Sequence, residues 1–411
     1  MEITDHCYYI GIDIDDQNAV VSYYRTGMKE PETVSLIAGG EVFQIPLLLS
    51  KKRGIGQWFI GEEARRTAMV QQEEPIDCLI SRALARETIR LEEETYAATD
   101  LLALYVKKLI LAASRLGNPG MPDKLVISVE KLSGELTELF FFVGEKLGLE
   151  RENLTLTDRK EGFYYFVLNQ PKDIWLHDVF LFDYRKDEMK CCLMQRNLKT
   201  VPQVITIAED TFKMSDTERD EQFLRILQEK FRGHIVSAVY LAGNGFEGDW
   251  MKLSLSFMCR GRRAFIGKNL YSKGACYAAR LLSEKTDWPY VYMGDNEMKV
   301  NISLKVKNRG KREFYTLISA GANWYEASKT CDVILDQTKE VDFWLQLPNS
   351  REAKIEKLEL TDLPERPNKT TRLRIYVKPL SDTEVQIKIR DMGFGEIVKG
   401  SDKTWEYTMS I

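Results

Sequence analysis

Apolar stretches and helical segments alternate along the first 284 residues. Residues 8–14 (YYIGIDI) and 124–129 (KLVISV) are short runs rich in β-branched and aromatic side chains, which is typical of buried strands. Residues 134–148 (GELTELFFFVGEKLG) repeat apolar positions at helical spacing. Ser215 and Glu218 have the spacing of a capping box before a second such segment, RDEQFLRILQEKF. The pattern predicts an α/β region in which helices cover buried strands.

The pattern changes after residue 284. From Lys299 onward, short segments alternate apolar and polar residues, as in KVNISLKV, EVDFWLQL, RLRIYVK and EVQIKIRD, and turn residues separate them. This spacing predicts an all-β antiparallel sandwich. We therefore expect two domains, 1–284 and 285–411.

Composition limits the classes of function. The 58 basic and 62 acidic residues nearly cancel, which argues against a nucleic-acid-binding protein. No apolar run approaches the roughly 20 residues that span a bilayer, and residues 1–7 do not resemble a signal peptide. The seven cysteines form no C-x-x-C pair, and the three histidines are far apart, so we expect free thiols and no zinc site. These features favour a cytoplasmic protein that binds neither nucleic acid nor membrane.

Several segments, taken in order, resemble the seventy-kilodalton heat-shock chaperones of the actin-like ATPase superfamily. IGIDIDDQNAVV is similar to the first phosphate loop of that family, and VFLFDYRKDEMKCCLM is similar to the second. FIGEEARRTA and LTDRKEGFYYFVL, which lie between these loops, and AVYLAGNGF followed by LYSKGACYAA resemble other motifs of the nucleotide-binding domain. Residues 355–391 are similar to the family's peptide-binding sandwich, and the helical lid that follows it is absent here.

The resemblance implies a two-lobed actin-like (ribonuclease H-like) ATPase fold over residues 1–284. The stretch from Asp183 to Leu241 is short compared with the family, which implies that one subdomain is missing. Residues 285–411 are expected to form a sandwich that resembles the chaperone peptide-binding domain.

The resemblance also implies which residues surround the nucleotide pocket. Phosphate loops use glycine and threonine because backbone N–H groups must face the anion. Here these positions hold charged or bulky side chains in both loops, while Gly243 and Gly245 keep a third glycine-rich turn. The positions that are acidic around magnesium in the family are still acidic, and Ser81 lies near the place of its catalytic lysine. The resulting vestigial pocket comprises Asp13, Asp15, Asp16, Asp158, Asp183, Arg185, Lys186, Gly243 and Gly245.

Two interpretations of Asp13, Asp158 and Asp183 are open at this stage. They could hold a hydrated divalent cation, or they could end strands and cap turns, and we favour the second. We expect a chaperone-like interaction scaffold with a pseudo-ATPase pocket, no catalytic residues, no metal and no cofactor, whose sandwich binds a protein or peptide partner. The alternatives are a slow ATPase of the same type that uses ATP and magnesium, and an actin-like protein that assembles with itself.

Overall fold

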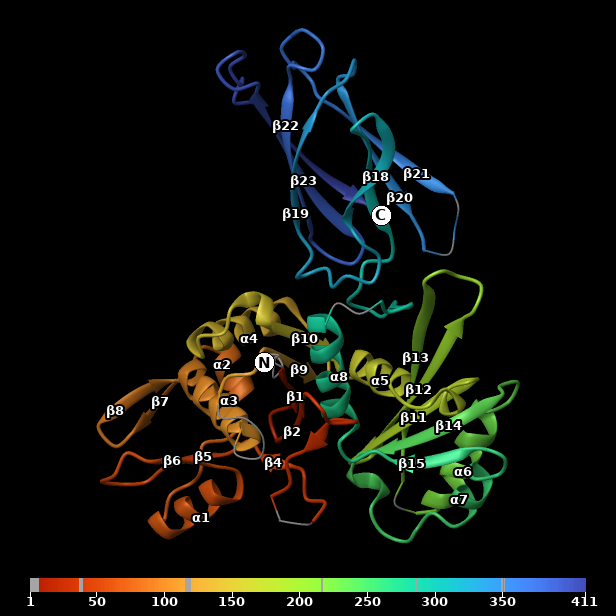
Figure 1. Cartoon of the computed structure of the whole chain (residues 1–411). Coiled ribbons are helices and arrows are strands. Elements are labelled where there is room, and N and C mark those ends of the chain that lie inside the picture. The colour runs from red at the N-terminus through yellow and green to blue at the C-terminus, as the bar shows by residue number, and fades with distance from the viewer. Residues whose placement is uncertain are drawn as a thin grey trace, which may run out of the picture. The chain divides into compact units, whose positions relative to one another are not determined.

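The computed structural model describes residues 7–36, 40–114, 120–215, 217–284, 287–348, 350 and 352–411. These residues form two compact units (Figure 1). The first unit combines residues up to Gln195 with Ala208–Trp288, and the second combines Arg196–Ile207 with Pro289–Ile411. Residue 285, where the sequence analysis begins the second domain, lies outside the described residues.

The first unit contains two mixed sheets. In the first sheet the strands lie in the order β10-β9-β1-β2-β3, and β4 also pairs with β2. β1, β9 and β10 run parallel, whereas β2 is antiparallel to β1. All residues of β1 are buried, as expected of a central strand covered on both faces. The strands are β1 (Tyr8–Ile14), β2 (Asn18–Arg25), β3 (Glu32–Thr33), β4 (Ile45–Pro46), β9 (Lys124–Val129) and β10 (Leu154–Asp158).

The second sheet repeats the same arrangement. Its order is β15-β14-β11-β12-β13, with β14 and β15 parallel to β11 and with β12 antiparallel to it. In both sheets, therefore, a long hairpin lies beside two parallel strands that come later in the chain. The strands are β11 (Asp178–Arg185), β12 (Glu188–Asn197), β13 (Gln203–Lys213), β14 (Val236–Ala242) and β15 (Arg263–Ile266).

Helices α5 (Arg159–Leu168) and α8 (Leu270–Glu284) pack against each other between the two sheets (Figure 1). α8 also packs on β1, where a Cβ atom added at Gly11 would lie only 2.2 Å from the backbone nitrogen of Cys276. A Cβ atom at Gly274 would lie 1.9 Å from the carbonyl oxygen of Gly162. Gly274 therefore allows α8 to approach α5 this closely, and Gly11 allows α8 to approach β1.

Other helices cover the outer faces of the sheets. α3 (Ala98–Ser114) packs on β2, and α4 (Gly134–Lys146) packs on α3 and β10. α6 (Arg219–Lys230) covers the second sheet, with the ring of Phe223 5.2 Å from that of Phe182. α7 (Leu253–Met258) packs beside α6.

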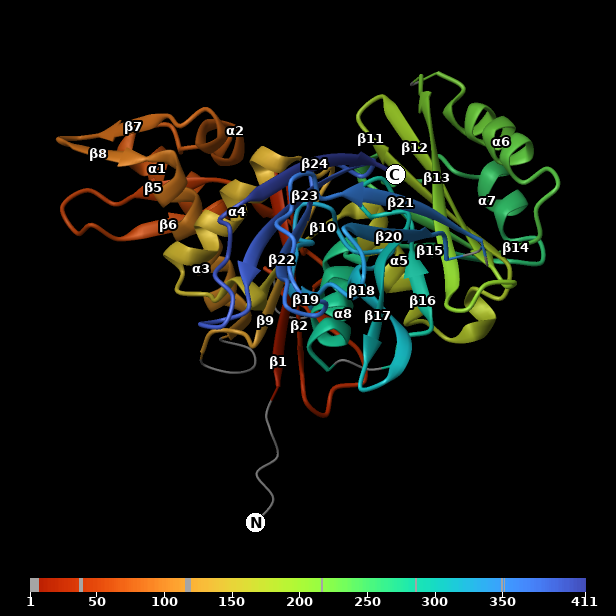
Figure 2. The same ribbon diagram turned by 90° about the horizontal axis from the view of Figure 1, so that it is seen from above.

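Shorter elements complete the first unit. Two hairpins and α1 lie together at one end of it in both views (Figure 1, Figure 2), joined where Trp58 meets Tyr96 edge to face. The elements are β5 (Leu49–Lys51), β6 (Trp58–Ile60), α1 (Gly61–Gln71), α2 (Leu79–Leu84), β7 (Thr88–Leu91), β8 (Glu94–Ala97), and the 3₁₀ helices η1 (Arg151–Asn153), η2 (Lys172–Ile174) and η3 (Asn244–Phe246).

The second unit is a sandwich of two antiparallel four-stranded sheets, in the orders β18-β17-β20-β21 and β19-β22-β23-β24. Apolar side chains from both sheets, including Ile302, Phe343, Ile375 and Ile387, form one buried core between them. β16 (Tyr290–Tyr292) pairs with the start of β13. The sandwich strands are β17 (Asn301–Asn308), β18 (Lys311–Ile318), β19 (Lys329–Ile334), β20 (Glu340–Gln346), β21 (Ala353–Glu359), β22 (Arg372–Pro379), β23 (Glu384–Gly393) and β24 (Thr404–Ser410).

The predicted capping box before α6 is wrong. Glu218 has a left-handed backbone with φ of 53°, and no side chain caps the first turn of the helix. Instead, Gln222 accepts a hydrogen bond from the N–H of Ser215 and donates one to the carbonyl of Lys213. A side chain from inside the helix therefore fixes the loop that the capping box was expected to fix.

Two further properties concern the whole chain. All seven cysteines are free thiols, as the sequence predicts. Within the described ranges, no helix is both long enough and apolar enough to cross a membrane.

Candidate functional site

The turn between β1 and β2 is closed by its own aspartate. The N–H of Asp15 donates to the carbonyl of Asn18 at 3.0 Å. The Oδ1 atom of Asp15 accepts the N–H groups of Gln17 and Asn18, both at 2.9 Å. This side-chain-to-backbone pattern is the Asx turn that aspartate forms readily. Three backbone donors of the turn, the N–H groups of Asp15, Gln17 and Asn18, therefore already have an acceptor.

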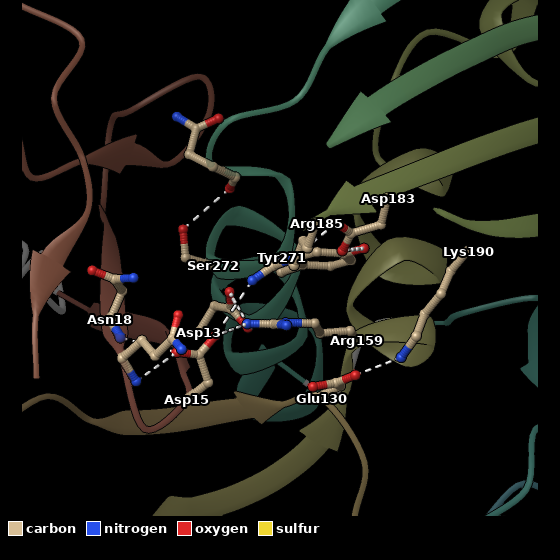
Figure 3. Close-up of polar contacts among 12 residues, drawn as sticks. Asp13, Asp15, Asn18, Glu130, Arg159, Asp183, Arg185, Lys190, Tyr271 and Ser272 are labelled. Carbon is tan, nitrogen blue, oxygen red and sulfur yellow. Dashed lines mark hydrogen bonds and ion pairs between the residues drawn. The ribbon is translucent and has the colours of Figure 1, made fainter. Parts of the chain in front are cut away.

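The second oxygen of Asp15 lies between two guanidinium groups. Oδ2 accepts from Nη2 of Arg159 at 2.9 Å and from Nη1 of Arg185 at 3.3 Å. Arg159 comes from the start of α5 beside the first sheet, and Arg185 from the end of β11 in the second sheet. Figure 3 shows Arg159 reaching toward both Asp13 and Asp15. One carboxylate thus links side chains that belong to the two halves of the first unit.

Arg159 is held by a second, buried carboxylate. Its Nε and Nη2 atoms donate to the two oxygens of Asp13 at 2.8 and 3.1 Å, a bidentate pair in which both side chains are less than a tenth exposed. The guanidinium group also lies 5.3 Å from the centre of the Tyr271 ring. A buried ion pair of this kind fixes geometry more than it adds net stability, because desolvation offsets most of its attraction.

Asp183 completes the cluster at the end of β11. It accepts from Nε of Arg185 at 2.9 Å and from the hydroxyl of Tyr271 at 2.8 Å. Tyr271 comes from the first turn of α8. Three carboxylates and two guanidinium groups are therefore interlocked, and α8 contributes the hydroxyl.

The pKa values follow from this packing. Burial alone would raise the pKa of Asp15, but Arg159 and the N–H groups of Asn18 and Gln17 lower it below its ordinary value. For the more deeply buried Asp13, desolvation raises the pKa although Arg159 opposes the shift. Burial would likewise lower the pKa of Arg159, yet Asp13 and Asp15 hold it well above its ordinary value. Arg159 is thus the permanently charged group that favours the ionised form of both carboxylates.

A cavity of about 570 Å³ opens beside the cluster. Seven carboxylates and five basic groups line it, so its wall carries a small excess of negative charge. Lys190 of β12 forms a further ion pair with Glu130 at its rim (Figure 3). Of the predicted pocket residues, the cavity is lined by Asp15, Asp16, Asp183, Arg185, Lys186 and Gly243.

Asp16 caps a helix. Its Oδ1 atom accepts the N–H groups of Ile80 and Ser81, at 2.8 and 3.2 Å, at the start of α2, and Oδ2 accepts the hydroxyl of Ser81. An acidic side chain is favoured at this end of a helix, where N–H groups lack partners. Ser81, the residue near the expected lysine position, is therefore bound to the first loop itself.

Asp158 takes part in local capping. Its Oδ1 atom accepts the N–H of Glu161 at 2.8 Å, as the N-cap of α5. Among the described residues, no group of three or more histidine, cysteine or acidic side chains has the arrangement of a metal site. Asp13 and Asp183 are instead engaged by arginines, so the described contacts do not bring the three acids together around a common centre.

The remaining predicted residues shape the turns. Lys186 has a left-handed backbone in the two-residue connection between β11 and β12. Gly243 has φ of 91°, and a Cβ atom there would lie 2.2 Å from the carbonyl oxygen of Tyr184. A Cβ atom at Gly245 would meet the ring of Tyr184 at 2.4 Å. The three-residue helix η3 follows Gly243, in place of the longer helix that an anion site at this point would use.

The sequence analysis did not identify Arg159, Tyr271 or Lys190. Arg159 follows Asp158 directly, at the carboxyl end of a buried strand. A basic residue at this end of β10, opposite the aspartates that follow β1, was the feature of the sequence that could have indicated the ion pair. Tyr271 carries no such signal, because an aromatic residue in an apolar helix face is usually part of the core.

The second unit has a larger groove, of about 1180 Å³. Its wall is formed by the β17–β18 hairpin, by β19, by the connection from β19 to β20 and by β20 itself. Val306, Val333, Leu335 and Val341 contribute apolar surface to it. β18 and β19 are edge strands of their sheets, and Lys329 of β19 lies over the ring of Tyr315 of β18. The groove therefore runs beside two strands that each pair on one side alone.

The fold and the two sites define a mixed α/β unit with an ion-paired cavity, followed by a β-sandwich with an open groove. Residues 30–295 match the C-terminal part of DUF5716, a family of unknown function, and this match covers more than half of the chain. The chain therefore belongs to that family. Residues 297–411 match DUF8552, a domain of unknown function. No curated protein matches the chain.

Proposed function

We propose that this protein is a non-hydrolysing interaction scaffold. In this proposal the first unit is an actin-like domain, related to the nucleotide-binding domain of the seventy-kilodalton heat-shock chaperones, whose phosphate loop is closed by its own side chains. The second unit is a sandwich that binds an extended segment of a partner protein. The repeated strand order of the two sheets supports the two-lobed actin-like interpretation.

The position of the Asp15 carboxylate carries the proposal. A phosphate loop binds its anion through backbone N–H groups and nearby cations. Here the carboxylate of Asp15 takes the N–H groups of Gln17 and Asn18 with one oxygen and the two arginines with the other. An internal anion thus occupies the groups that an external phosphate would need.

A nucleotide with magnesium does not fit this site. A carboxylate about 4 Å from a phosphate charge costs about 4 kcal/mol at an effective dielectric near 20. Two of the five basic groups that line the cavity, Arg159 and Arg185, are already paired with Asp13, Asp15 and Asp183. We therefore assign the first unit no hydrolytic step.

The groove of the second unit supports the binding role. Edge strands accept an additional extended chain through their free backbone groups, and pockets for alternate side chains give selectivity. The groove adjoins two such edges and exceeds the volume of a typical small-molecule pocket. We expect binding that is fast and micromolar.

Peptide binding to the full chain tests this function. We expect a fluorescent peptide of about ten residues that alternates leucine and serine to bind with micromolar affinity, and Val333→Asp to weaken binding by about tenfold or more because it places a charge in the apolar wall. Fluorescence anisotropy measures both. The matched control is Ile397→Asp, at an apolar residue 80% exposed outside the groove, which should leave binding unchanged. An affinity unaffected by Val333→Asp, or binding that requires ATP, would contradict the proposal.

A further inference from the structure

The hairpin at one wall of the groove carries an unusual set of cations. Five basic residues occur within eight positions, with no acidic residue among them, and all five are exposed. Within the part of the chain that the structure describes, none of them forms an ion pair, although Lys305 lies 5.1 Å from the centre of the Trp344 ring. The residues are Lys305, Lys307, Arg309, Lys311 and Arg312.

Most of the acids of the groove are already neutralised by other partners. Asp332 pairs with Arg374 at 2.8 Å, outside the hairpin. Asp336 lies 3.7 Å from Lys369. Glu340 lies 3.5 Å from Lys357. The positive charge of the hairpin is therefore left for a ligand to complement.

The groove has an apolar wall, and the five cations of the hairpin form a basic rim beside it. A ligand that contacts both needs two kinds of side chain. In an extended segment, successive side chains point to opposite sides, so alternate residues can enter the groove while the others reach the rim. Val306 and Val333 offer apolar contact inside it, and Tyr315 is 37% exposed at its edge. A segment with an apolar residue at every second position makes contact with the apolar wall. Acidic residues between these positions pair with the cations of the rim.

We infer that the groove selects an extended polypeptide segment in which acidic and apolar residues alternate. This inference rests on the proposed function and specifies its ligand. A polypeptide fits better than a nucleic acid because a phosphate backbone would bring continuous negative charge against Glu313 and Asp342, the two acids of the same wall that the ion pairs above do not neutralise. The chain as a whole also carries a net charge of −4.

Three peptides of equal length test the selection on the full chain. Each alternates leucine with one other residue, which is glutamate, serine or lysine. At low salt we expect the glutamate peptide to bind at least about tenfold more tightly than the lysine peptide, with the serine peptide between them, and we expect the difference to shrink at high salt. Fluorescence anisotropy against ionic strength gives the three affinities.

A double substitution locates the effect. Lys307→Ser with Lys311→Ser should weaken the glutamate peptide about fivefold and leave the serine peptide within about twofold, since only rim charges are removed. The control is Lys52→Ser with Lys378→Ser, which removes two exposed lysines that lie outside the groove. Unchanged binding of the glutamate peptide in the hairpin variant would overturn the inference.

The possible outcomes distinguish a failure of this inference from a failure of the proposed peptide-binding function. Equal affinity for all three peptides would refute the acidic selection and leave peptide binding intact. Binding of none of them would refute the proposed function as well. Tighter binding of a single-stranded oligonucleotide than of the glutamate peptide, lost in the hairpin variant, would assign the basic hairpin to nucleic acid and overturn the inference.

Discussion

Arg159→Met is expected to destabilise the first unit by about 3–5 kcal/mol at neutral pH. The guanidinium group is the bidentate partner of Asp13, whose side chain is nearly fully buried, and it also pairs with Asp15. Removing one member of a buried pair leaves the other charge without compensation, which costs far more than the intact pair contributes. Urea unfolding of the full chain, with hydrogen exchange in β1 and α5, measures the loss in the first unit.

The pH dependence of this variant has a defined sign. Burial already raises the pKa of Asp13, and without Arg159 the main group that opposes this increase is gone, so that Arg185 alone still lowers the pKa. A carboxyl whose folded pKa exceeds its unfolded value of about 3.9 is least destabilising at low pH, and its cost grows as pH rises through the folded pKa. The difference in free energy of unfolding between Arg159→Met and the wild type should therefore narrow as pH falls toward the ordinary pKa of a carboxyl.

Two further variants control this result. Adding Asp13→Asn to Arg159→Met removes the uncompensated charge and should recover a large part of the stability. Arg263→Met breaks an exposed ion pair with Asp173 and should cost less than about 1 kcal/mol. If Arg159→Met is as mild as Arg263→Met, the cluster does not hold the first unit together.

Asp391→Ala is expected to have a comparable effect on the sandwich, about 3–5 kcal/mol. Asp391 is 1% exposed and accepts two hydrogen bonds from Arg366, both at 2.7 Å. It also accepts the N–H of Gly393 and both the N–H and the hydroxyl of Ser401, which fixes the loop after β23. The substitution leaves Arg366 with the carbonyl of Lys399 but without a carboxylate, and it removes the acceptor of the other donors, which is costly for buried groups.

Lowering the pH should remove the difference in free energy of unfolding between the wild type and Asp391→Ala. Burial alone would raise the pKa of Asp391, but Arg366 and Ser401 hold it well below its ordinary value. Such a group stabilises the folded state above its unfolded pKa, and this contribution is lost as pH falls through the folded pKa. Urea denaturation of both proteins across acidic pH measures how their free energies of unfolding converge.

Asp332→Ala, which breaks a more exposed pair with Arg374, is the control and should cost about 1 kcal/mol or less.

The apolar pattern predicts the strands that are buried on both faces better than it predicts edge strands. β1, β9 and β11 lie where the β-branched runs place them, because burial on both faces requires such a run. β15 and β19 were not predicted, since each is a short edge strand with several exposed residues. The apolar stretch over residues 41–50 contains two short strands, β4 and β5, and Pro46 ends the first of them.

For the candidate site, the sequence pattern predicts where the carboxylates lie but not which groups they bind. Hydrophobic runs end at Asp13 and Asp183, and strand pairing is enough to place such residues at the carboxyl ends of central strands. What each carboxylate binds depends on residues distant in sequence, such as Arg159 for Asp13 and the start of α2 for Asp16. The abundance of aspartate in the first turn, which is unusual for a phosphate loop, is explained by these contacts and not by the local pattern.

Calorimetric titration of the full chain with Mg-ATP tests the central claim most directly. If the carboxylate of Asp15 occupies the anion-binding groups of the loop, the titration should give no saturable heat, and millimolar Mg-ATP should leave the melting temperature unchanged. A ligand present at 100 times its Kd would add about 2.7 kcal/mol to the free energy of unfolding, so binding could not pass unnoticed. Saturable one-to-one binding that disappears in Asp13→Ala would contradict the account.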